Sequence, residues 1–341
     1  MSVFELRGQT NMIEMVVLGS LLLLVATLLL GIVFEQIQEW RDFRRFPPPG
    51  RIVDVDGRAM HLFCQGEGDG PTIVIEQGAG SPSIFWWPVQ RALAKAARVC
   101  TYDRCGYLWS AALGKGRSIT ARVEDLRALL MSSGLPGPFV LVAHSYGGLL
   151  LGQLARCYPE LIAGVVFVDV PDERVIYGGR YLEQSKRMLS IIGIMAFAAR
   201  FGLLRVFNPM LAGLPAQFTP SDIATLKSLA ARPGFLAAMV DDFGSMGRAT
   251  AEERQSPAPG SLRGAPISVV SHGVPFPAPY DALNEGWEEG QARLAALSTN
   301  SELVIAEKSS HMIPFEQPDV VIGAIARVHA AARDGARLVA R

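Results

Sequence analysis

The sequence predicts an α/β fold with a mostly parallel sheet of eight strands, helices on both faces and one N-terminal transmembrane helix. Three observations predict it. Short apolar runs alternate with helical patterns through residues 51–332, as buried parallel strands and crossover helices do. Asp56-Gly57 lies between two such runs and is a strong hairpin signal, so the sheet begins with an antiparallel pair. An uncharged apolar segment near the N-terminus is long enough to span a bilayer.

That segment, Met15–Phe34, is flanked by Glu14 and Glu35. At 1.5 Å per residue its length is about 30 Å, the thickness of the hydrocarbon core of a bilayer. No small-x-small cleavage site follows it, so we expect an uncleaved anchor rather than a secretory signal. The lipid bilayer is therefore the expected partner of residues 15–34, and the helix also offers a surface to another membrane protein.

Residues typical of a membrane interface follow at once: Trp40, Arg41, Arg44 and Arg45. These positive residues outnumber Arg7 and the N-terminal amine on the other side, which favours a cytoplasmic domain. Acidic residues are interspersed among the arginines, and the side of the membrane stays open.

The strands are expected at Arg51–Val55, Arg58–Cys64, Thr72–Ile75, Arg98–Tyr102, Phe139–Ala143, Gly164–Asp169, Ile267–Ser271 and Glu302–Ala306. The helices are expected at Phe85–Ala97, Thr120–Ser133, Tyr146–Tyr158, Trp287–Leu297 and Pro318–Ala332. The alternation stops between the sixth and seventh strands, where a structureless loop would be improbably long, so we expect a helical cap. The predicted units are the anchor with its juxtamembrane segment (1–46), a first part of the core (47–170), the cap (171–263) and a second part of the core (264–341).

Composition excludes several classes of function. Lys and Arg together number 32, as do Asp and Glu, so the near-zero net charge gives no reason to expect nucleic acid as a partner. The four cysteines lack the spacing of metal ligands, and no motif implies a metal or an organic cofactor. We expect Cys64, Cys100, Cys105 and Cys157 to be buried free thiols, with a Cys64–Cys100 bridge as the alternative because both lie on predicted strands.

The segment Ala143-His144-Ser145-Tyr146-Gly147 lies where a strand gives way to a helix. A serine on such a sharp turn is held in a strained backbone conformation and requires small residues two positions before and after it. Ala143 and Gly147 meet that requirement. The turn would project the Ser145 hydroxyl above the sheet, as a nucleophile requires, whereas the alternative is a serine that only caps a helix.

With this motif the chain resembles the α/β-hydrolase superfamily across residues 51–332, in which the nucleophile, acid and histidine follow in that order on loops after strands. His311 follows the last predicted strand in the segment SSHMIPFEQPD and matches the histidine loop of the superfamily. As a base, it would take the Ser145 proton and later donate it to the leaving group. His144 is expected to point away from the turn.

The acid has two candidates. No carboxylate follows the seventh strand until Asp281, whereas the sixth strand ends in Asp169. Haloalkane dehalogenases, a related branch, carry their acid at this second position. A carboxylate that ends an apolar parallel strand also needs a partner, which His311 would provide. We therefore predict Asp169 as the acid, with Asp281 as the alternative.

The resemblance also places an oxyanion hole between two backbone N–H groups. One belongs to Tyr146, directly after the nucleophile, and the other to Ala79 in the glycine-rich loop after the third strand. Trp86 and Trp87, just past this loop, are predicted to line the substrate pocket, together with Phe197 of the apolar cap.

A serine nucleophile with a histidine base implies acyl transfer through an acyl-enzyme. The apolar cap near a bilayer predicts a small hydrophobic ester or related acyl substrate, and the apolar run 188–199 is expected to dock at the membrane surface. The alternative is a catalytically silent or slow copy of the fold that serves as a membrane-bound binding or assembly subunit.

Overall fold

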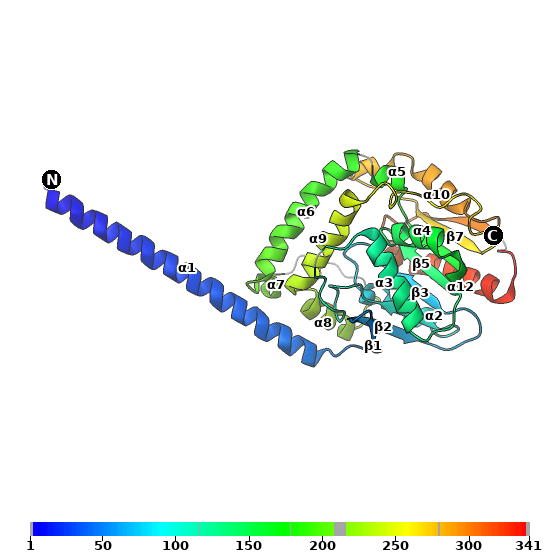
Figure 1. Ribbon diagram of the computed structural model, residues 1–341, viewed down its shortest axis with the longest axis horizontal. Coiled ribbons are helices and arrows are strands. Elements are labelled where there is room, and N and C mark those ends of the chain that lie inside the picture. The colour runs from blue at the N-terminus through cyan, green and yellow to red at the C-terminus, as the bar shows by residue number, and fades with distance from the viewer. Residues whose placement is uncertain (1–2, 115, 178, 208–215, 279, 339–341) are drawn as a thin grey trace.

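The computed structural model describes residues 3–114, 116–177, 179–207, 216–278 and 280–338. Its sheet has eight strands in the order β1-β2-β4-β3-β5-β6-β7-β8. The sheet lies in the body of the molecule, and α1 projects from that body (Figure 1). β2 pairs antiparallel with both β1 and β4, and all other neighbours run parallel, which confirms the predicted fold class. The strands are β1 Arg51–Val55, β2 Arg58–Gln65, β3 Ile73–Glu76, β4 Val99–Tyr102, β5 Phe139–His144, β6 Ile162–Val168, β7 Ile267–His272 and β8 Ser301–Ala306.

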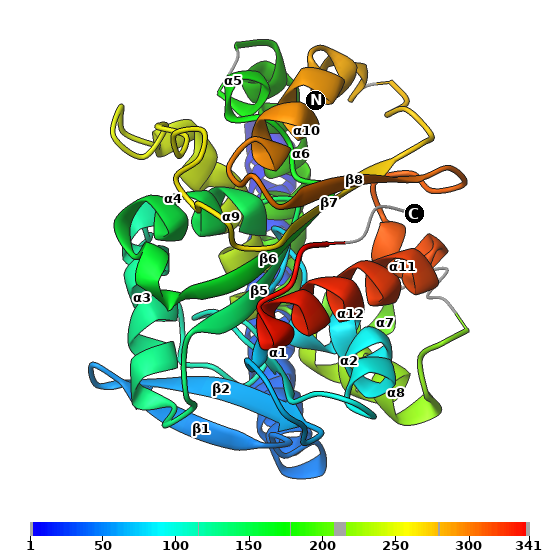
Figure 2. The same ribbon diagram turned by 90° about the vertical axis from the view of Figure 1, so that its right-hand side faces the viewer.

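Helices cover both faces of this sheet (Figure 2). The α-helices are α1 Val3–Arg45, α2 Trp87–Leu93, α3 Ile119–Ser132, α4 Gly147–Cys157, α5 Glu173–Ile176, α6 Gly179–Ala199, α7 Leu203–Val206, α8 Pro220–Leu229, α9 Pro233–Arg248, α10 Trp287–Ala295, α11 Ile313–Glu316 and α12 Pro318–Asp334. Short 3₁₀ turns lie at Ser83–Trp86, Pro159–Leu161 and Asp281–Asn284. Alternate residues of β5 face opposite ways: Leu141 packs with α3 and α4, whereas Val140 and Val142 pack with α2 and α12.

The segment between β6 and β7 forms the cap, in which α6 and α9 lie side by side (Figure 1). The cap has its own apolar core, in which Leu226, Leu229 and Phe235 pack with Tyr107 and Leu108 from the loop after β4. Within the predicted cap, residues 178 and 208–215 lie outside the described part of the chain.

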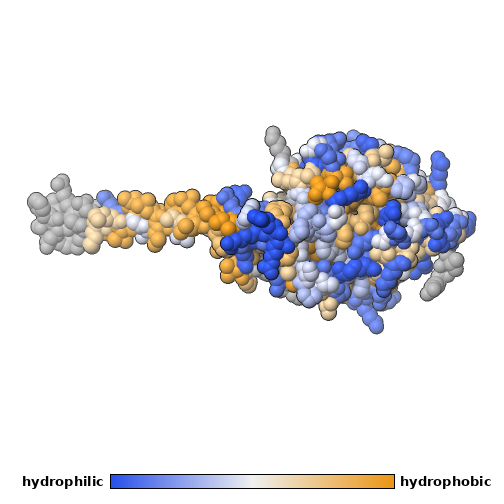
Figure 3. Space-filling view, turned by 90° about the horizontal axis from the view of Figure 1, so that it is seen from below, coloured by the Kyte–Doolittle hydropathy of each residue, from blue (hydrophilic) through white to orange (hydrophobic). Residues whose placement is uncertain are grey.

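Among the described helices, α1 alone is long and apolar enough by itself to cross a membrane, over Met12–Arg45. A signal sequence near an N-terminus would meet the same criterion. Figure 3 shows that most of its apolar surface projects from the body of the molecule. Its C-terminal end is fixed to the body, because the indole N–H of Trp109 donates to the carbonyl of Phe46 at 2.8 Å.

The expectation of free thiols is wrong for two of the four cysteines. Cys64 on β2 and Cys100 on β4 form a disulfide, with their Cα atoms 4.0 Å apart. The antiparallel pairing of these strands places the two residues directly opposite each other. Cys105 is buried and free, as expected, whereas Cys157 is free but exposed, contrary to the expected burial.

Candidate active site

Ser145 occupies the turn between β5 and α4 with a φ of 51°, a conformation that costs free energy in a residue other than glycine. The glycines after it are required by close contacts. A Cβ on Gly147 would lie 2.8 Å from the carbonyl oxygen of Glu76, and one on Gly148 would lie 2.1 Å from the Val170 side chain. The turn is therefore pressed against the ends of β3 and β6.

Three predicted site residues meet at the carboxyl edge of the sheet. His311, in the loop between β8 and α11, places its Nε2 2.8 Å from the Ser145 Oγ. Its Nδ1 lies 2.7 Å from Oδ2 of Asp169, the residue directly after β6. Asp281 lies elsewhere: it is partly exposed and pairs with Arg180 at 3.0 Å. The structure thus brings Asp169, and not Asp281, to the histidine.

Asp169 has a second histidine partner, which sequence reasoning missed. The backbone N–H of His272 donates to Asp169 Oδ1 at 2.8 Å, and the His272 Nδ1 lies at the same distance from that oxygen. Burial by itself would raise the pKa of the Asp169 carboxyl, but the hydrogen bonds from His272 and His311 outweigh it and hold this pKa below its ordinary value. The carboxyl is therefore ionised at neutral pH. The available signal was the position of His272 at the end of β7, the strand that pairs with β6.

His144 does not stay apart from the site, contrary to the expectation. Its Nε2 lies 3.0 Å from the carbonyl oxygen of His311, so this ring supports the histidine loop. Burial, and then the nearby His311 imidazole, lower the pKa of His144 to about 4. A neutral ring is therefore present at neutral pH, and its Nε2–H donates to the His311 carbonyl.

The two predicted oxyanion donors flank the serine. The loop after β3 approaches the turn so closely that a Cβ on Gly78 would lie 3.0 Å from the His144 ring and 3.3 Å from the Ser145 Cβ. Across the described residues, the backbone N–H groups of Ala79 and Tyr146 donate to no protein acceptor. Both remain available to a negatively charged oxygen placed beside Ser145.

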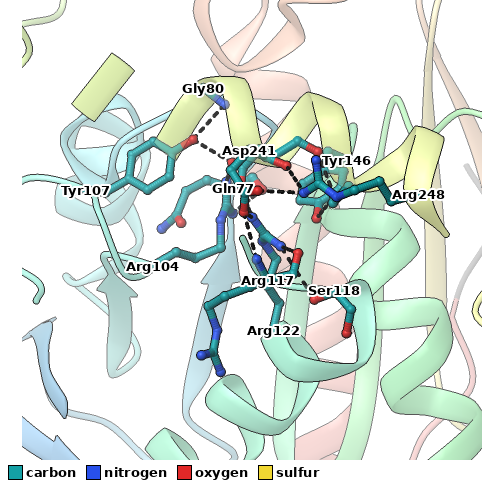
Figure 4. A network of polar contacts seen from close by, with 12 residues as sticks. Gln77, Gly80, Arg104, Tyr107, Arg117, Ser118, Arg122, Tyr146, Asp241 and Arg248 are labelled. Atoms are coloured by element: carbon teal, nitrogen blue, oxygen red, sulfur yellow. Dashed lines mark hydrogen bonds and ion pairs between the residues drawn. The ribbon is translucent and has the colours of Figure 1, made fainter. Parts of the chain in front are cut away.

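A buried polar network supports the loop after β3 and joins it to the cap (Figure 4). The Arg104 guanidinium donates to the carbonyl oxygens of Gln77 and Gly78, each at 2.8 Å, and pairs with Asp242 of α9 at 2.7 Å. The Tyr107 hydroxyl accepts the backbone N–H of Gly80 at 3.0 Å and donates to the same Asp242. Sequence reasoning missed this network, because its members are far apart in the chain.

A cavity of about 370 Å³ ends at Ser145 and His311. Apart from the glycine-rich loop after β3 and the polar residues of the site, its wall is largely apolar and includes Ile176, Tyr181, Met188, Phe243, Met246, Phe276, Tyr280, Leu283 and Met312.

The prediction that Trp86, Trp87 and Phe197 line this cavity is wrong. Trp86 is buried in the core of the sheet, and Trp87 stacks on Trp109 with ring centroids 6.0 Å apart. Phe197 faces outward from α6 and is 60% exposed. Trp86 and Trp87 follow the glycine-rich loop closely in the chain, but that proximity does not fix where each ring packs.

The described residues contain no group of three or more histidine, cysteine or acidic side chains that could hold a metal ion. The site consists of a serine, two histidines that contact one carboxylate, two free backbone donors and an apolar cavity. Such an arrangement at the carboxyl edge of a mostly parallel sheet defines a hydrolytic α/β enzyme.

The alpha/beta hydrolase family model matches residues 73–324, and the chain belongs to this family. Two relatives from Bacillus subtilis strain 168 are the uncharacterized proteins YbdG and YqjL. YbdG is 28% identical over 205 residues, which cover 58% of this chain and 61% of YbdG; the match therefore spans less than two thirds of that relative. YqjL is 25% identical over 293 residues, 83% of this chain and 92% of YqjL. The enol-lactonase from Burkholderia xenovorans LB400 has the same fold, with a TM-score of 0.56 at 18% identity over 82% of this chain and 99% of its own.

Proposed function

We propose that this chain is a membrane-anchored serine hydrolase that cleaves a hydrophobic ester or related acyl substrate through an acyl-enzyme. The observation that carries the proposal is the continuous path of hydrogen bonds from Ser145 Oγ through the His311 ring to Asp169, open to an apolar cavity. The ionised Asp169 accepts the Nδ1–H of His311, which leaves Nε2 free to accept the serine proton.

In the proposed reaction, Ser145 Oγ attacks the substrate carbonyl carbon while His311 Nε2 takes the hydroxyl proton. The negative charge that develops on the carbonyl oxygen is stabilised by the N–H groups of Ala79 and Tyr146. The C–O bond to the leaving group then breaks, and His311 returns the proton to the departing oxygen. The same histidine then takes a proton from water, which attacks the acyl carbon. The bond to Ser145 Oγ breaks, His311 returns the proton to that oxygen, and the acid is released.

A fluorophosphonate probe on the full-length protein tests this proposal. We expect covalent labelling of the wild type and none of Ser145→Ala, with Ser110→Ala as a control serine away from the cavity. Absence of labelling in folded wild-type protein would favour the other candidate, a silent binding or assembly subunit, which α1 as a docking helix would serve equally well.

We further propose that α1 is an uncleaved anchor and that the soluble domain faces an oxidising compartment. The Cys64–Cys100 disulfide supports this side, because such bonds persist outside the reducing cytosol. The cluster of arginines after the helix favours the opposite side by only a small excess of charge. A membrane-impermeant maleimide applied to intact cells should label the exposed Cys157. Labelling only after permeabilisation would overturn the assignment.

A further inference from the structure

A second apolar surface lies beside α1, on the outside of the cap. It consists of Ile191, Ile194 and Phe197 of α6, Leu203 and Val206 of α7, and Phe207, which directly follows α7. These side chains are strongly exposed, up to 87% for Val206. We call these six residues the cap patch.

The polarity of α6 changes along its length. In its first half the outward positions carry Glu183, Lys186 and Arg187, all exposed. In its second half they carry Ile191, Ile194 and Phe197. A helix that faced water throughout would keep a polar outer face, so the change indicates two different surroundings for the two halves.

Direct contacts fix the cap patch at a defined height on α1. The Phe201 carbonyl oxygen lies so close that a Cβ on Gly31 would be 2.9 Å from it, and a Cβ on Gly202 would be 2.6 Å from the Phe34 ring. The Arg205 guanidinium forms two hydrogen bonds with the Glu35 carboxylate, at 2.6 and 2.7 Å. The turn between α6 and α7 is thereby held against α1 over the last residues of its apolar segment (Figure 1).

The position along the helix indicates what covers the cap patch. Gly31 precedes the end of the apolar segment by three residues, or about 4.5 Å along the axis. Trp40, with the Arg44 guanidinium 4.7 Å from its ring centroid, lies beyond that end, as side chains at a membrane interface do. If α1 spans a bilayer, the cap patch lies at the boundary of the hydrocarbon.

The cap patch is also close to the cavity along the chain. Tyr181 and Met188 of α6 line the cavity, and Ile191 of the cap patch follows Met188 within one helical turn. The inner face of the helix therefore borders the site while the outer face of its second half is apolar and exposed.

We propose that the cap patch inserts into the same bilayer interface as α1 and that substrates dissolved in the membrane enter the cavity from there. The proposal rests on the proposed anchoring and hydrolase function and adds the route by which the substrate arrives. The occupant of the surface is lipid, because the surface continues the apolar face of α1.

Fluorescence of single labelled cysteines tests the insertion. Full-length protein, with Cys157→Ser as background, carries an environment-sensitive dye at Val206→Cys, at Lys186→Cys as control on the polar half of α6, or at Leu22→Cys within α1. In phosphatidylcholine–phosphatidylglycerol vesicles we expect brominated lipids to quench the dyes at 22 and 206 but not at 186. Quenching at 22 alone would overturn the insertion and leave the anchor in place, whereas quenching at neither would overturn both.

Activity provides the second readout. Ile194→Asp combined with Val206→Asp should lower kcat/KM at least tenfold for a long-chain ester embedded in vesicles and leave a soluble short-chain p-nitrophenyl ester unchanged. Lys186→Glu, the control on the same helix, should change neither. Equal activity of the double variant on the vesicle substrate would overturn the route. The route would also be overturned if the detergent-solubilised wild type formed a dimer and the double variant did not, because a second copy would then cover the cap patch.

Discussion

At the carboxyl edge of the sheet Ser145, His311 and Asp169 are hydrogen-bonded to one another, whereas on the outside of α6 and α7 the apolar side chains of the cap patch are exposed. Asp169 accepts hydrogen bonds from two imidazoles and a backbone N–H while fully buried. Val206, at the other extreme, is 87% exposed. The first region is preorganised by internal contacts, and in our proposal lipid covers the second. The network around Arg104 and Asp242 joins the loop after β3 to α9, which packs against α6.

The largest expected effect breaks the first region at its acid. Asp169→Asn removes the charge that holds the His311 ring in its reactive tautomer, so we expect kcat to fall roughly 10⁴-fold, or about 5 kcal/mol in activation free energy. Ester hydrolysis by purified protein measures it. Asp281→Asn, on the exposed alternative acid, should retain wild-type activity, and the reverse result would make Asp281 the functional carboxylate.

The next effect concerns the buried network between the loop after β3 and α9. Arg104→Met leaves the buried Glu76 without its cation and leaves Asp242 paired with Arg122 alone, which should lower the free energy of unfolding by about 3–5 kcal/mol. Urea denaturation followed by tryptophan fluorescence measures it. Arg127→Met is the matched control, because the Arg127–Glu124 pair is partly exposed and contributes about 1 kcal/mol or less. Equal losses of unfolding free energy would show that the buried network stabilises the protein no more than an exposed ion pair does.

The three residues at the centre of the candidate site could be predicted from the sequence. Ser145 and His311 were recognisable because each chemical role requires a residue type at a fixed place in the chain, after a strand and on a short turn. Asp169 followed from the resemblance to haloalkane dehalogenases together with the rule that a carboxylate ending a buried strand needs a partner. Each inference is local, and the structure brings these three residues together.

What the sequence did not reveal depends on packing between distant segments. The pairing of β2 with β4, which places Cys64 opposite Cys100, is a choice of topology that no local pattern specifies. Arg104 meets Asp242 across 138 positions of the chain. Trp87 is as apolar in the core as it would be in a pocket wall, so composition alone could not decide its side.

A smaller effect separates the neutral support histidine from the reactive one. The pKa of His144, about 4, lies below the ordinary value of 6.5, so the unfolded chain takes up a proton first as the pH falls. Its stabilising contribution is complete above pH 6.5 and is lost between 6.5 and 4, by about 3 kcal/mol. His144→Gln keeps an N–H donor without this titration. Its free energy of unfolding, measured at pH 7, 5.5 and 4.5, should therefore fall less steeply than that of the wild type.

The smallest expected effect, repeated with each added carbon, tests whether the apolar cavity reads the acyl chain. Each methylene moved from water into its wall of Met188, Phe243 and Phe276 should lower the transition-state free energy by about 0.8 kcal/mol, or about fourfold in kcat/KM. A series of p-nitrophenyl esters measured below their micelle-forming concentrations would show this slope until the cavity of about 370 Å³ is full, and then a plateau or decline. Met246→Trp, which narrows the cavity, should move the break to shorter chains. A flat series in both proteins would mean that the acyl group binds elsewhere, and the contrast between the preorganised site and the exposed cap patch would then have no bearing on substrate choice.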